Sequence, residues 1–292
     1  LWPLISQKRQ EILFAHTSFK WKNLASHNAG VTVIIVGVGR QEKSDKHLFF
    51  IDESGQTGKR TASNINAYLV PAADAVIEQR RESLGDVAVM LKGNQPTDGG
   101  FLSLTPLEAQ GLIASDPEAE KFVYRNLGSK ELIRGEMRYC LWIEDEQAQA
   151  AAQIEGIGER LTQVATFRAV SKAPTTRPFA EVPHRFRQIQ SVGVSTSIVI
   201  PSVSSEAREY LPVGLVGEKT IVSNLAFALY DAPIWNLALI ASKLHLVWIA
   251  TVCGKMKTDF RYSNTLGWNT FPVPKLTEKN KEDLTRCAED IL

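Results

Sequence analysis

Residues 30–39 read Gly-Val-Thr-Val-Ile-Ile-Val-Gly-Val-Gly, a run of β-branched residues that ends in glycines. β-Branched side chains favour an extended backbone. Because the run is almost continuously apolar and does not alternate with polar residues, it predicts a strand covered on both faces, as in the sheet of an α/β protein.

Strand-like and helix-like segments follow along the rest of the chain. Strand composition is found at residues 46–52, 137–143, 195–201 and 213–222. Helical spacing is found at residues 105–113, 144–164, 233–253 and 277–292. A polar and aromatic loop is expected at residues 255–274. The predicted fold class is therefore α/β, in the mixed α+β sense, with more than one unit.

Residues 92–100 consist almost entirely of turn-forming residues, so we expect an exposed functional loop or the start of a domain there. A short helix should follow. Thr105 has the position of an N-cap, Pro106 that of the first helical residue, and Glu108 completes a capping box.

Charge and cysteine content limit the kinds of partner. The 292 residues carry a net charge of +1, so a polyanion would have to bind locally clustered cations. Three widely separated cysteines, Cys140, Cys253 and Cys287, predict neither a disulfide framework nor a zinc site, and favour a reducing cytoplasm. No apolar run reaches the ~20 residues that span a bilayer, so no membrane partner is expected.

A nucleophilic enzyme is one hypothesis for this chain. Cys140 is its candidate nucleophile, but a lone cysteine in a strand-like segment is more often a buried small side chain. His245 lies within a predicted helix and is more often a core residue than a ligand. The common hydrolase, metalloprotease and kinase motifs are missing from the sequence.

Cations gather in residues 168–187, which contain five Lys or Arg residues against the single acid Glu181. Cations and hydroxyls in a loop suit phosphate contacts. A solvated basic loop without a partner is an equally good interpretation of this composition.

Two further stretches combine charged and hydroxyl side chains. In an extended backbone Lys257 and Asp259 share a face, so Lys257 can donate to guanine while Asp259 accepts from cytosine. Spacing alone favours a surface salt bridge instead. Residues 201–210 form a hydroxyl-rich turn with Arg208, suited either to contacts with DNA or to a helix start capped by Ser204 or Ser205.

Several segments, in order along the chain, resemble the MmeI-like family of single-chain restriction-modification enzymes (type IIL, a branch of type IIG). The most specific is Gly-Lys-Met-Lys-Thr-Asp-Phe-Arg-Tyr-Ser-Asn at residues 254–264. The others are residues 19–33, 64–69, 93–100, 138–143, 200–206 and 268–272.

This resemblance implies that the chain is part of a longer protein, as its start at Leu1 without a methionine also suggests. Residues 1–75 would be the last strands of an adenine methyltransferase domain. Residues 76–274 would be the target-recognition domain, and residues 275–292 the start of C-terminal helices. The implied function is recognition of double-stranded DNA for an N6-adenine methyltransferase, and the implied partners are that DNA and the upstream methyltransferase and endonuclease domains.

The chain departs from the family at the motifs that carry catalysis. The family methylates adenine through an Asn-Pro-Pro-Tyr/Phe motif and binds S-adenosylmethionine through a Phe-x-Gly-x-Gly-type loop, and neither occurs here. S-adenosylmethionine and Mg²⁺ are therefore expected only for the full-length parent. We expect no catalytic residues, no cofactor and no activity in these residues alone.

The resemblance also assigns roles to residues. Lys257 and Asp259 would read one G·C base pair, with Lys257 on the guanine. Other candidates near bases are Ser204, Ser205, Glu206 and Arg208. Candidates near the DNA backbone are Lys172, Arg177, Arg185, Arg187, Lys255 and Arg261.

Two rival hypotheses stay open at this point. A type I-like specificity subunit that docks on separate catalytic chains would have a methionine start and two recognition repeats, and neither is seen. An unrelated enzyme would need a base close to Cys140, or a histidine-centred site.

Overall fold

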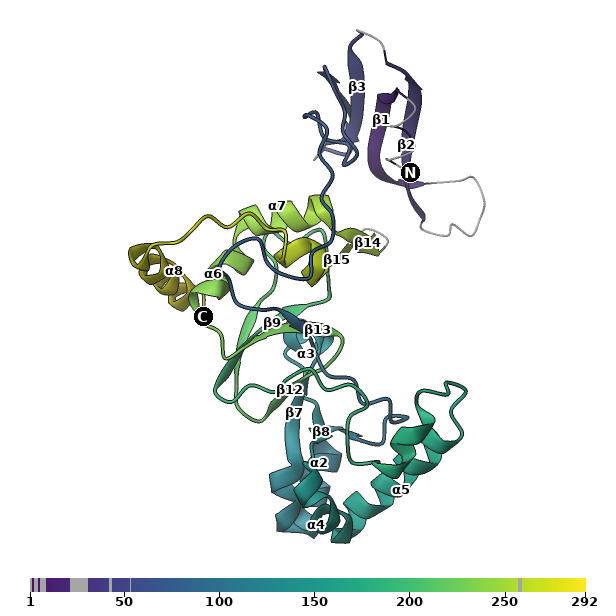
Figure 1. Ribbon diagram of the computed structural model, residues 1–292, viewed down its shortest axis with the longest axis vertical. Coiled ribbons are helices and arrows are strands. Elements are labelled where there is room, and N and C mark those ends of the chain that lie inside the picture. The colour runs from purple at the N-terminus through teal and green to yellow at the C-terminus, as the bar shows by residue number, and fades with distance from the viewer. Residues whose placement is uncertain are drawn as a thin grey trace.

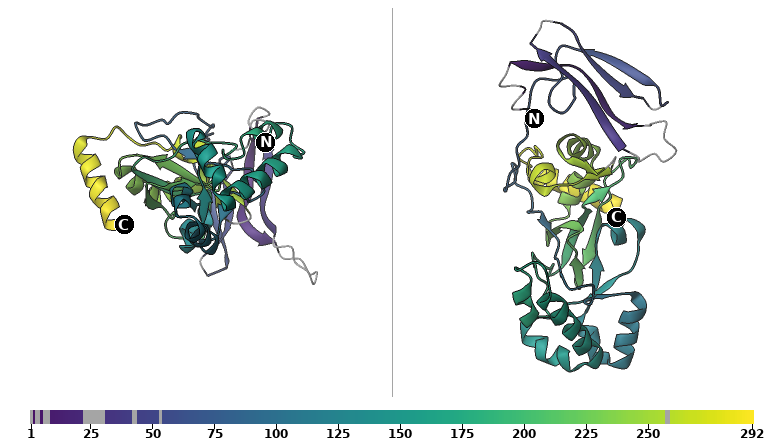
Figure 2. Two further views of the ribbon diagram at one scale, coloured as in Figure 1. Left: turned by 90° about the horizontal axis from the view of Figure 1, so that it is seen from below. Right: turned by 90° about the vertical axis from the view of Figure 1, so that its right-hand side faces the viewer.

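The chain divides into three parts along its long axis. The computed structural model describes residues 2, 5, 9–21, 31–41, 44–52, 54–256 and 259–292. Figure 1 shows an N-terminal sheet, a central part that also holds the C-terminus, and a lobe rich in helices. The right-hand view in Figure 2 shows the same succession. The mixed α/β class predicted from the sequence is confirmed.

The N-terminal part is a four-stranded sheet in the order β2-β1-β3-β4. Its strands are β1 (Gln10–Trp21), β2 (Val31–Arg40), β3 (Lys46–Ile51) and β4 (Thr57–Ala62). β1 pairs antiparallel with β2 and parallel with β3. Ile12, Ala15, Leu48 and Ile65 form its small core.

The strand predicted at residues 30–39 is present as β2, but the expectation that both its faces are covered is wrong for this chain. β2 is an edge strand, and Ile34 is 54% exposed. The helices whose bounds the structure describes all belong to the other two parts (Figure 1), so none of them covers this strand.

The central part is built on an antiparallel sheet in the order β11-β9-β13-β5. These strands are β5 (Leu91–Lys92), β9 (Thr196–Pro201), β11 (Gly214–Gly217) and β13 (Ala226–Tyr230). The helices beside them are α6 (Trp235–Ala241), α7 (Lys243–Val252) and α8 (Glu278–Ile291). Side chains of the sheet and the helices share one core, which includes Ile198, Leu229, Leu237, Ile249 and Trp268.

The lobe contains a second sheet, in the order β12-β7-β8-β6. Its strands are β6 (Ser103–Leu104), β7 (Val123–Leu127), β8 (Tyr139–Leu141) and β12 (Thr220–Val222). Its helices are α2 (Pro106–Ser115), α4 (Ala148–Gln153) and α5 (Glu155–Ala169). Helix α3 (Ser129–Arg134) lies where the two sheets meet and contacts both β7 and β9. Short 3-10 helices are η1 (Pro117–Phe122), η2 (Asp145–Gln147) and η3 (Arg177–Glu181). The core of the lobe includes Leu102, Phe122, Leu141, Ile157 and Val164.

Helix starts were predicted better than helix lengths. The capping box at α2 is confirmed, because the Glu108 N–H donates to Thr105 Oγ1 at 3.2 Å and the Thr105 N–H donates to Glu108 Oε2 at 2.8 Å. The helix predicted at residues 144–164 is split at Ile154, whose backbone is extended and whose side chain is buried. The helix predicted at residues 233–253 is split at Ser242, which caps α7.

Residues 92–100 run from the central sheet into the lobe. The expectation of an exposed loop is wrong for most of them, although Lys92, Gly99 and Gly100 are exposed. The interpretation as the start of a domain stays a prediction. Gly93, Asn94 and Asp98 are buried. The Asn94 amide donates to Ser191 O at 2.8 Å, and its Oδ1 accepts from the Gln190 N–H at 2.7 Å. A turn-rich composition does not distinguish an exposed loop from a buried crossing between sheets.

Residues 80–90 lie against residues 264–271, which are far away in the sequence. The Arg80 N–H donates to Thr265 O at 3.0 Å, and the Leu84 N–H to Asn269 O at 2.9 Å. The Trp268 indole donates to Ala88 O at 2.8 Å. The segment by which the chain enters the central part is therefore held against the segment that precedes α8.

In the part of the chain that the structure describes, no single helix is long and apolar enough to cross a membrane. Helices α6 and α7 satisfy length and composition only as a pair, and they are bent by 58°.

Candidate nucleic-acid interface

A small three-stranded sheet joins two of the segments that the sequence singled out. Its order is β10-β15-β14, with β10 (Val203–Ser204), β14 (Gly254–Met256) and β15 (Asp259–Arg261). β14 and β15 form a hairpin in which Lys255 pairs with Phe260 and Met256 with Asp259. The loop expected at residues 255–274 is thus wrong in part, because it contains this hairpin and the π-helical turn η4 (Asn264–Trp268).

The hairpin holds one half of the predicted base-reading pair. Asp259 begins β15 and is partly buried. Lys257, like Thr258, lies outside the described residues, so the structure gives its side chain no position.

A buried aromatic cluster fixes β15 to α7. His245 Nε2 and Tyr262 OH are 2.9 Å apart, and the His245 ring packs edge-on against Phe271 at 4.6 Å between centroids. Burial lowers the pKa of His245 to about 3, and burial raises the pKa of Tyr262 well above its usual value. His245 is therefore the core residue that the sequence favoured, and neutral at physiological pH.

Strand β10 brings residues 204–208 beside the hairpin. Ser204 is buried, and its hydroxyl has no hydrogen-bond partner among the described residues. Glu206 Oε2 and Lys255 Nζ form an ion pair at 3.2 Å. Ser205 is half-buried, and Arg208 is exposed. Ser204 ends strand β10 and residues 206–207 form a turn, so the alternative of a capped helix start at Ser204 or Ser205 is wrong.

Residues 171–188, which we name the basic segment, follow the end of α5 in the lobe. Lys172 and Arg177 are exposed, and Arg177 donates through Nε to Ser171 O at 2.9 Å. Arg187 makes a side-chain hydrogen bond within the segment, in which its Nη2 donates to Thr175 Oγ1 at 2.9 Å. Arg185 Nε lies 3.2 Å from Asp145 Oδ1, so its charge is partly balanced within the chain.

Arg168 differs from the other cations of this stretch because it is fully buried. Each of its five hydrogen bonds goes to a backbone carbonyl, at 2.8–3.1 Å; the acceptors belong to Pro96, Thr97, Phe179, Val182 and Arg185. Counting it among loop cations is therefore wrong. The helical spacing of the sequence could have indicated this burial, because Arg168 continues the buried stripe of Ile157, Leu161 and Val164 on α5.

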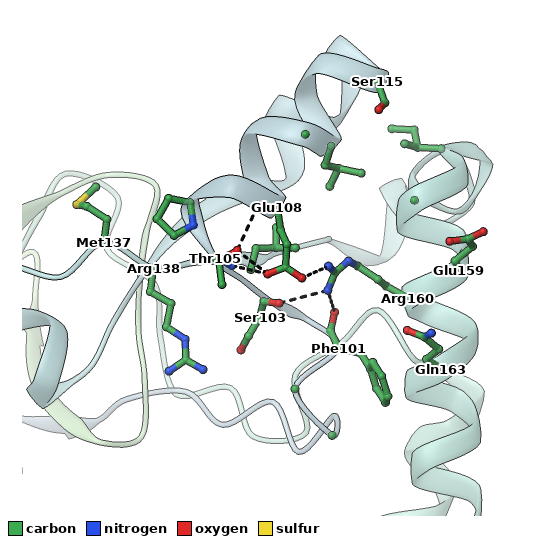
Figure 3. Close-up of a pocket in the computed structure, with 18 of the residues that line it drawn as sticks. Phe101, Ser103, Thr105, Glu108, Ser115, Met137, Arg138, Glu159, Arg160 and Gln163 are labelled. Carbon is green, nitrogen blue, oxygen red and sulfur yellow. Dashed lines mark hydrogen bonds and ion pairs between the residues drawn. The ribbon is translucent and has the colours of Figure 1, made fainter.

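A groove of about 1320 Å³ lies between α2 and α5 (Figure 3). Arg160 crosses it, with Nη2 at 2.7 Å from Glu108 Oε1 and Nη1 donating to Phe101 O at 3.0 Å. Hydrogen bonds from Thr105, followed by the one from Arg160, lower the pKa of Glu108 to about 2. These charges serve the helix cap and the packing of α5, and none of the predicted site residues lines the groove.

The nucleophile hypothesis finds no support at Cys140. Its thiol is fully buried in the lobe, and burial, followed by the charge of Asp98, raises its pKa. A nucleophilic cysteine needs the opposite shift and some exposure. Among the described residues, no group of three or more His, Cys, Asp or Glu side chains is placed to hold a metal ion.

Taken together, the structure describes an α/β unit with an exposed hairpin and a basic segment, joined to a separate N-terminal sheet. Two family models match it: the target recognition domain of MmeI over residues 71–275, and the DNA-methyltransferase domain of MmeI over residues 1–50. The chain belongs to the MmeI family, and residues 71–275 are its target recognition domain.

Two relatives match over the whole chain. DNA methyltransferase A of Bacillus subtilis (strain 168) is 37% identical over 292 residues, which is 100% of this chain and 33% of that protein. A solved structure of the Type IIL restriction-modification enzyme MmeI in complex with DNA is 32% identical, with a TM-score of 0.91 over 100% of this chain and 39% of that one. The chain thus spans about a third of the length of these relatives.

Proposed function

We propose that this chain reads the base sequence of duplex DNA for a longer methyltransferase of the MmeI family. One observation carries the proposal: β10, β14 and β15 bring two polar segments, more than 45 residues apart in the sequence, to one small sheet. A two-stranded ribbon fits the major groove, where each base pair presents a distinct pattern of donors and acceptors. The MmeI structure that it resembles holds DNA.

The residues at this sheet divide into two proposed roles. Lys257 and Asp259 read one G·C pair, with Lys257 on the guanine and Asp259 on the cytosine amino group. Their neighbours near bases are Ser205, Glu206 and Arg208, while Ser204 would have to leave its buried position to reach one. Arg261 is exposed and suits a phosphate. Lys255 also suits a phosphate, in exchange for its ion pair with Glu206.

The basic segment supplies a second, sequence-independent contact in this proposal. Lys172 and Arg177 present exposed cations, whereas Arg185 and Arg187 first have to leave Asp145 and Thr175. In Figure 1 the hairpin and the end of α5 both lie on the right-hand side of the molecule. In this proposal one duplex along that side contacts both.

The methyl transfer itself belongs to residues outside this chain. S-adenosylmethionine would supply the methyl group, but residues 1–75 contain neither of the motifs by which the family binds it and selects adenine. We assign no step of that chemistry, and no Mg²⁺ site, to these residues. Nothing in the comparisons supports the alternative of a separate specificity subunit. The domain boundaries at residues 75 and 274 stay predictions.

The test maps methylated sites across a host genome for the full-length parent and for a Lys257→Glu, Asp259→Arg double variant. One G·C position of the methylated motif should change or relax while methylation persists, because the exchanged charges now suit the opposite orientation of the pair. A Lys275→Glu, Glu278→Arg variant is the control, because it exchanges two exposed charges outside the hairpin.

The outcomes separate the residues from the function. An unchanged motif in the double variant would show that Lys257 and Asp259 do not read the base pair. A parent that methylates no defined motif would contradict the proposed function as a whole.

A further inference from the structure

Arg168 places a full positive charge in the interior of the lobe, and among the described residues no carboxylate is its direct partner. Burial lowers the pKa of the guanidinium, and the charge of Asp98 opposes that shift. All five of its hydrogen bonds go to backbone carbonyls. Burying a charge is costly even when it is hydrogen-bonded. An apolar residue at this place, continuing the stripe of Val164, would fill the core without that cost.

The five acceptors define what Arg168 does locally. They lie on two separate segments: Pro96 and Thr97 on one, and Phe179, Val182 and Arg185 on the other. A planar fork of five donors holds such carbonyls in one fixed arrangement, whereas a lysine offers three rotatable donors. Arg168 therefore ties the basic segment to residues 96–97 and to the end of α5.

The basic segment has little regular structure of its own to keep it in place. Its only helix among the described residues is the short η3. At its far end, Gln188 and Gln95 exchange two backbone hydrogen bonds, of 3.0 and 2.9 Å. Between these points Phe186 packs on Trp142 and His184 lies 2.8 Å from Asp145, both near the far end, while Arg168 holds carbonyls from Phe179 onward. The exposed heads of Lys172 and Arg177 stay available.

We propose that Arg168 is a positioning residue for DNA binding: it holds the basic segment in one conformation, so that Lys172 and Arg177 meet phosphates already in place. This inference rests on the proposed function. Fixing a loop in one conformation costs backbone entropy. A segment ordered before binding avoids that loss when DNA arrives.

The experiment is a double-mutant cycle on the full-length parent. Arg168→Met, Lys172→Gln with Arg177→Gln, and their combination are titrated with a short duplex that lacks the methylated motif, at several salt concentrations. Each lost phosphate contact reduces the slope of log K against log salt by about 0.9. The Lys172 and Arg177 variant should therefore flatten the slope by roughly 2. Arg168→Met should flatten it in the same direction and weaken binding about tenfold, because both cations lose their fixed position.

Two comparisons separate positioning from general stability. In the variant that already lacks Lys172 and Arg177, Arg168→Met should weaken DNA binding almost no further, because Arg168 acts through those two cations. Arg160→Met is the matched control: Arg160 lies on the same helix and also donates to backbone carbonyls, but away from the basic segment. It should lower the melting temperature and leave the salt slope unchanged.

Each remaining outcome decides one question. A folded Arg168→Met protein with the wild-type salt slope overturns the inference. A loss of affinity from Arg168→Met that adds fully to the loss from the Lys172 and Arg177 variant overturns it as well. If Arg168→Met does not fold, Arg168→Lys takes its place in the cycle, since it keeps the charge with fewer donors. If the Lys172 and Arg177 variant binds DNA like wild type, the phosphate role of these residues in the proposed function is contradicted instead.

Discussion

At the scale of single residues, the neutral imidazole of His245 lies beneath the proposed reading hairpin. Its nearest described neighbours are Tyr262, Trp268 and Phe271, so no carboxylate is in place to stabilise an imidazolium. Protonation would put an uncompensated charge in this cluster. The anchor of the hairpin should therefore be sensitive to acid.

This leads to a prediction about pH. The pKa of His245 is about 3 in the folded chain against 6.5 for the free side chain, so the unfolded state binds a proton first as pH falls. Stability is fully present above pH 6.5 and is lost towards pH 3, at up to about 1.4 kcal/mol per pH unit. Urea unfolding of wild type and His245→Gln at several pH values checks this. Equal slopes in the two proteins would contradict it.

Charge and spacing alone favoured a surface salt bridge for Lys257 and Asp259. The resemblance assigned these two residues the reading role, which stays a prediction. Arg168 and Ser204 were misplaced, because a sequence does not state which cations and hydroxyls other segments will cover. Their burial follows from contacts with residues many positions away.

At the scale of elements, the crossing at residues 92–94 joins the two large sheets. The Gly93 N–H donates to Ala226 O and the Asn94 N–H to Val222 O, at 3.0 and 2.7 Å. A Cβ on Gly93 would lie 2.2 Å from the carbonyl oxygen of Ser223. The two backbones approach so closely that only a glycine fits between them.

Gly93→Ala should accordingly destabilise the chain by about 1–3 kcal/mol, because the sheets have to separate locally. Gly217→Ala is the matched control, since nothing lies within 4 Å of a Cβ there. Chemical denaturation of both variants measures the difference. Equal midpoints would show that the crossing tolerates the extra methyl group.

The strands and helix starts could be predicted because they depend on local composition and capping. Sheet order could not, because β9 pairs with β11 and β13 while β12 joins β7 from far earlier in the chain. The helix breaks at Ile154 and Ser242 were missed for a similar reason. Each break turns an apolar face towards a core that the local sequence does not reveal.

At the scale of the whole molecule, α8 is part of the central core. Ala288 is fully buried in the cluster that also holds Leu237 and Trp268, and Leu284 packs against it. Helix α8 is drawn in yellow beside α6 in Figure 1. The helix expected to start a separate C-terminal region therefore also covers the recognition unit.

Ala288→Asp should detach α8, because it buries a carboxylate without a partner, at a cost of about 3 kcal/mol or more. Cys287→Asp adds the same charge at the neighbouring exposed position and should have little effect. Tryptic cleavage after Lys281 and Arg286 reports the detachment. Equal resistance of the two variants would show that α8 does not depend on this contact.

The pairing of residues 80–90 with residues 264–271 has a consequence for how such proteins diversify. The two segments form a single joint, sealed by backbone and indole hydrogen bonds. A lineage could exchange everything between these two segments in one recombination event and keep the joint together with α8. New specificities would then spread as interchangeable cassettes, while the catalytic machinery is inherited unchanged.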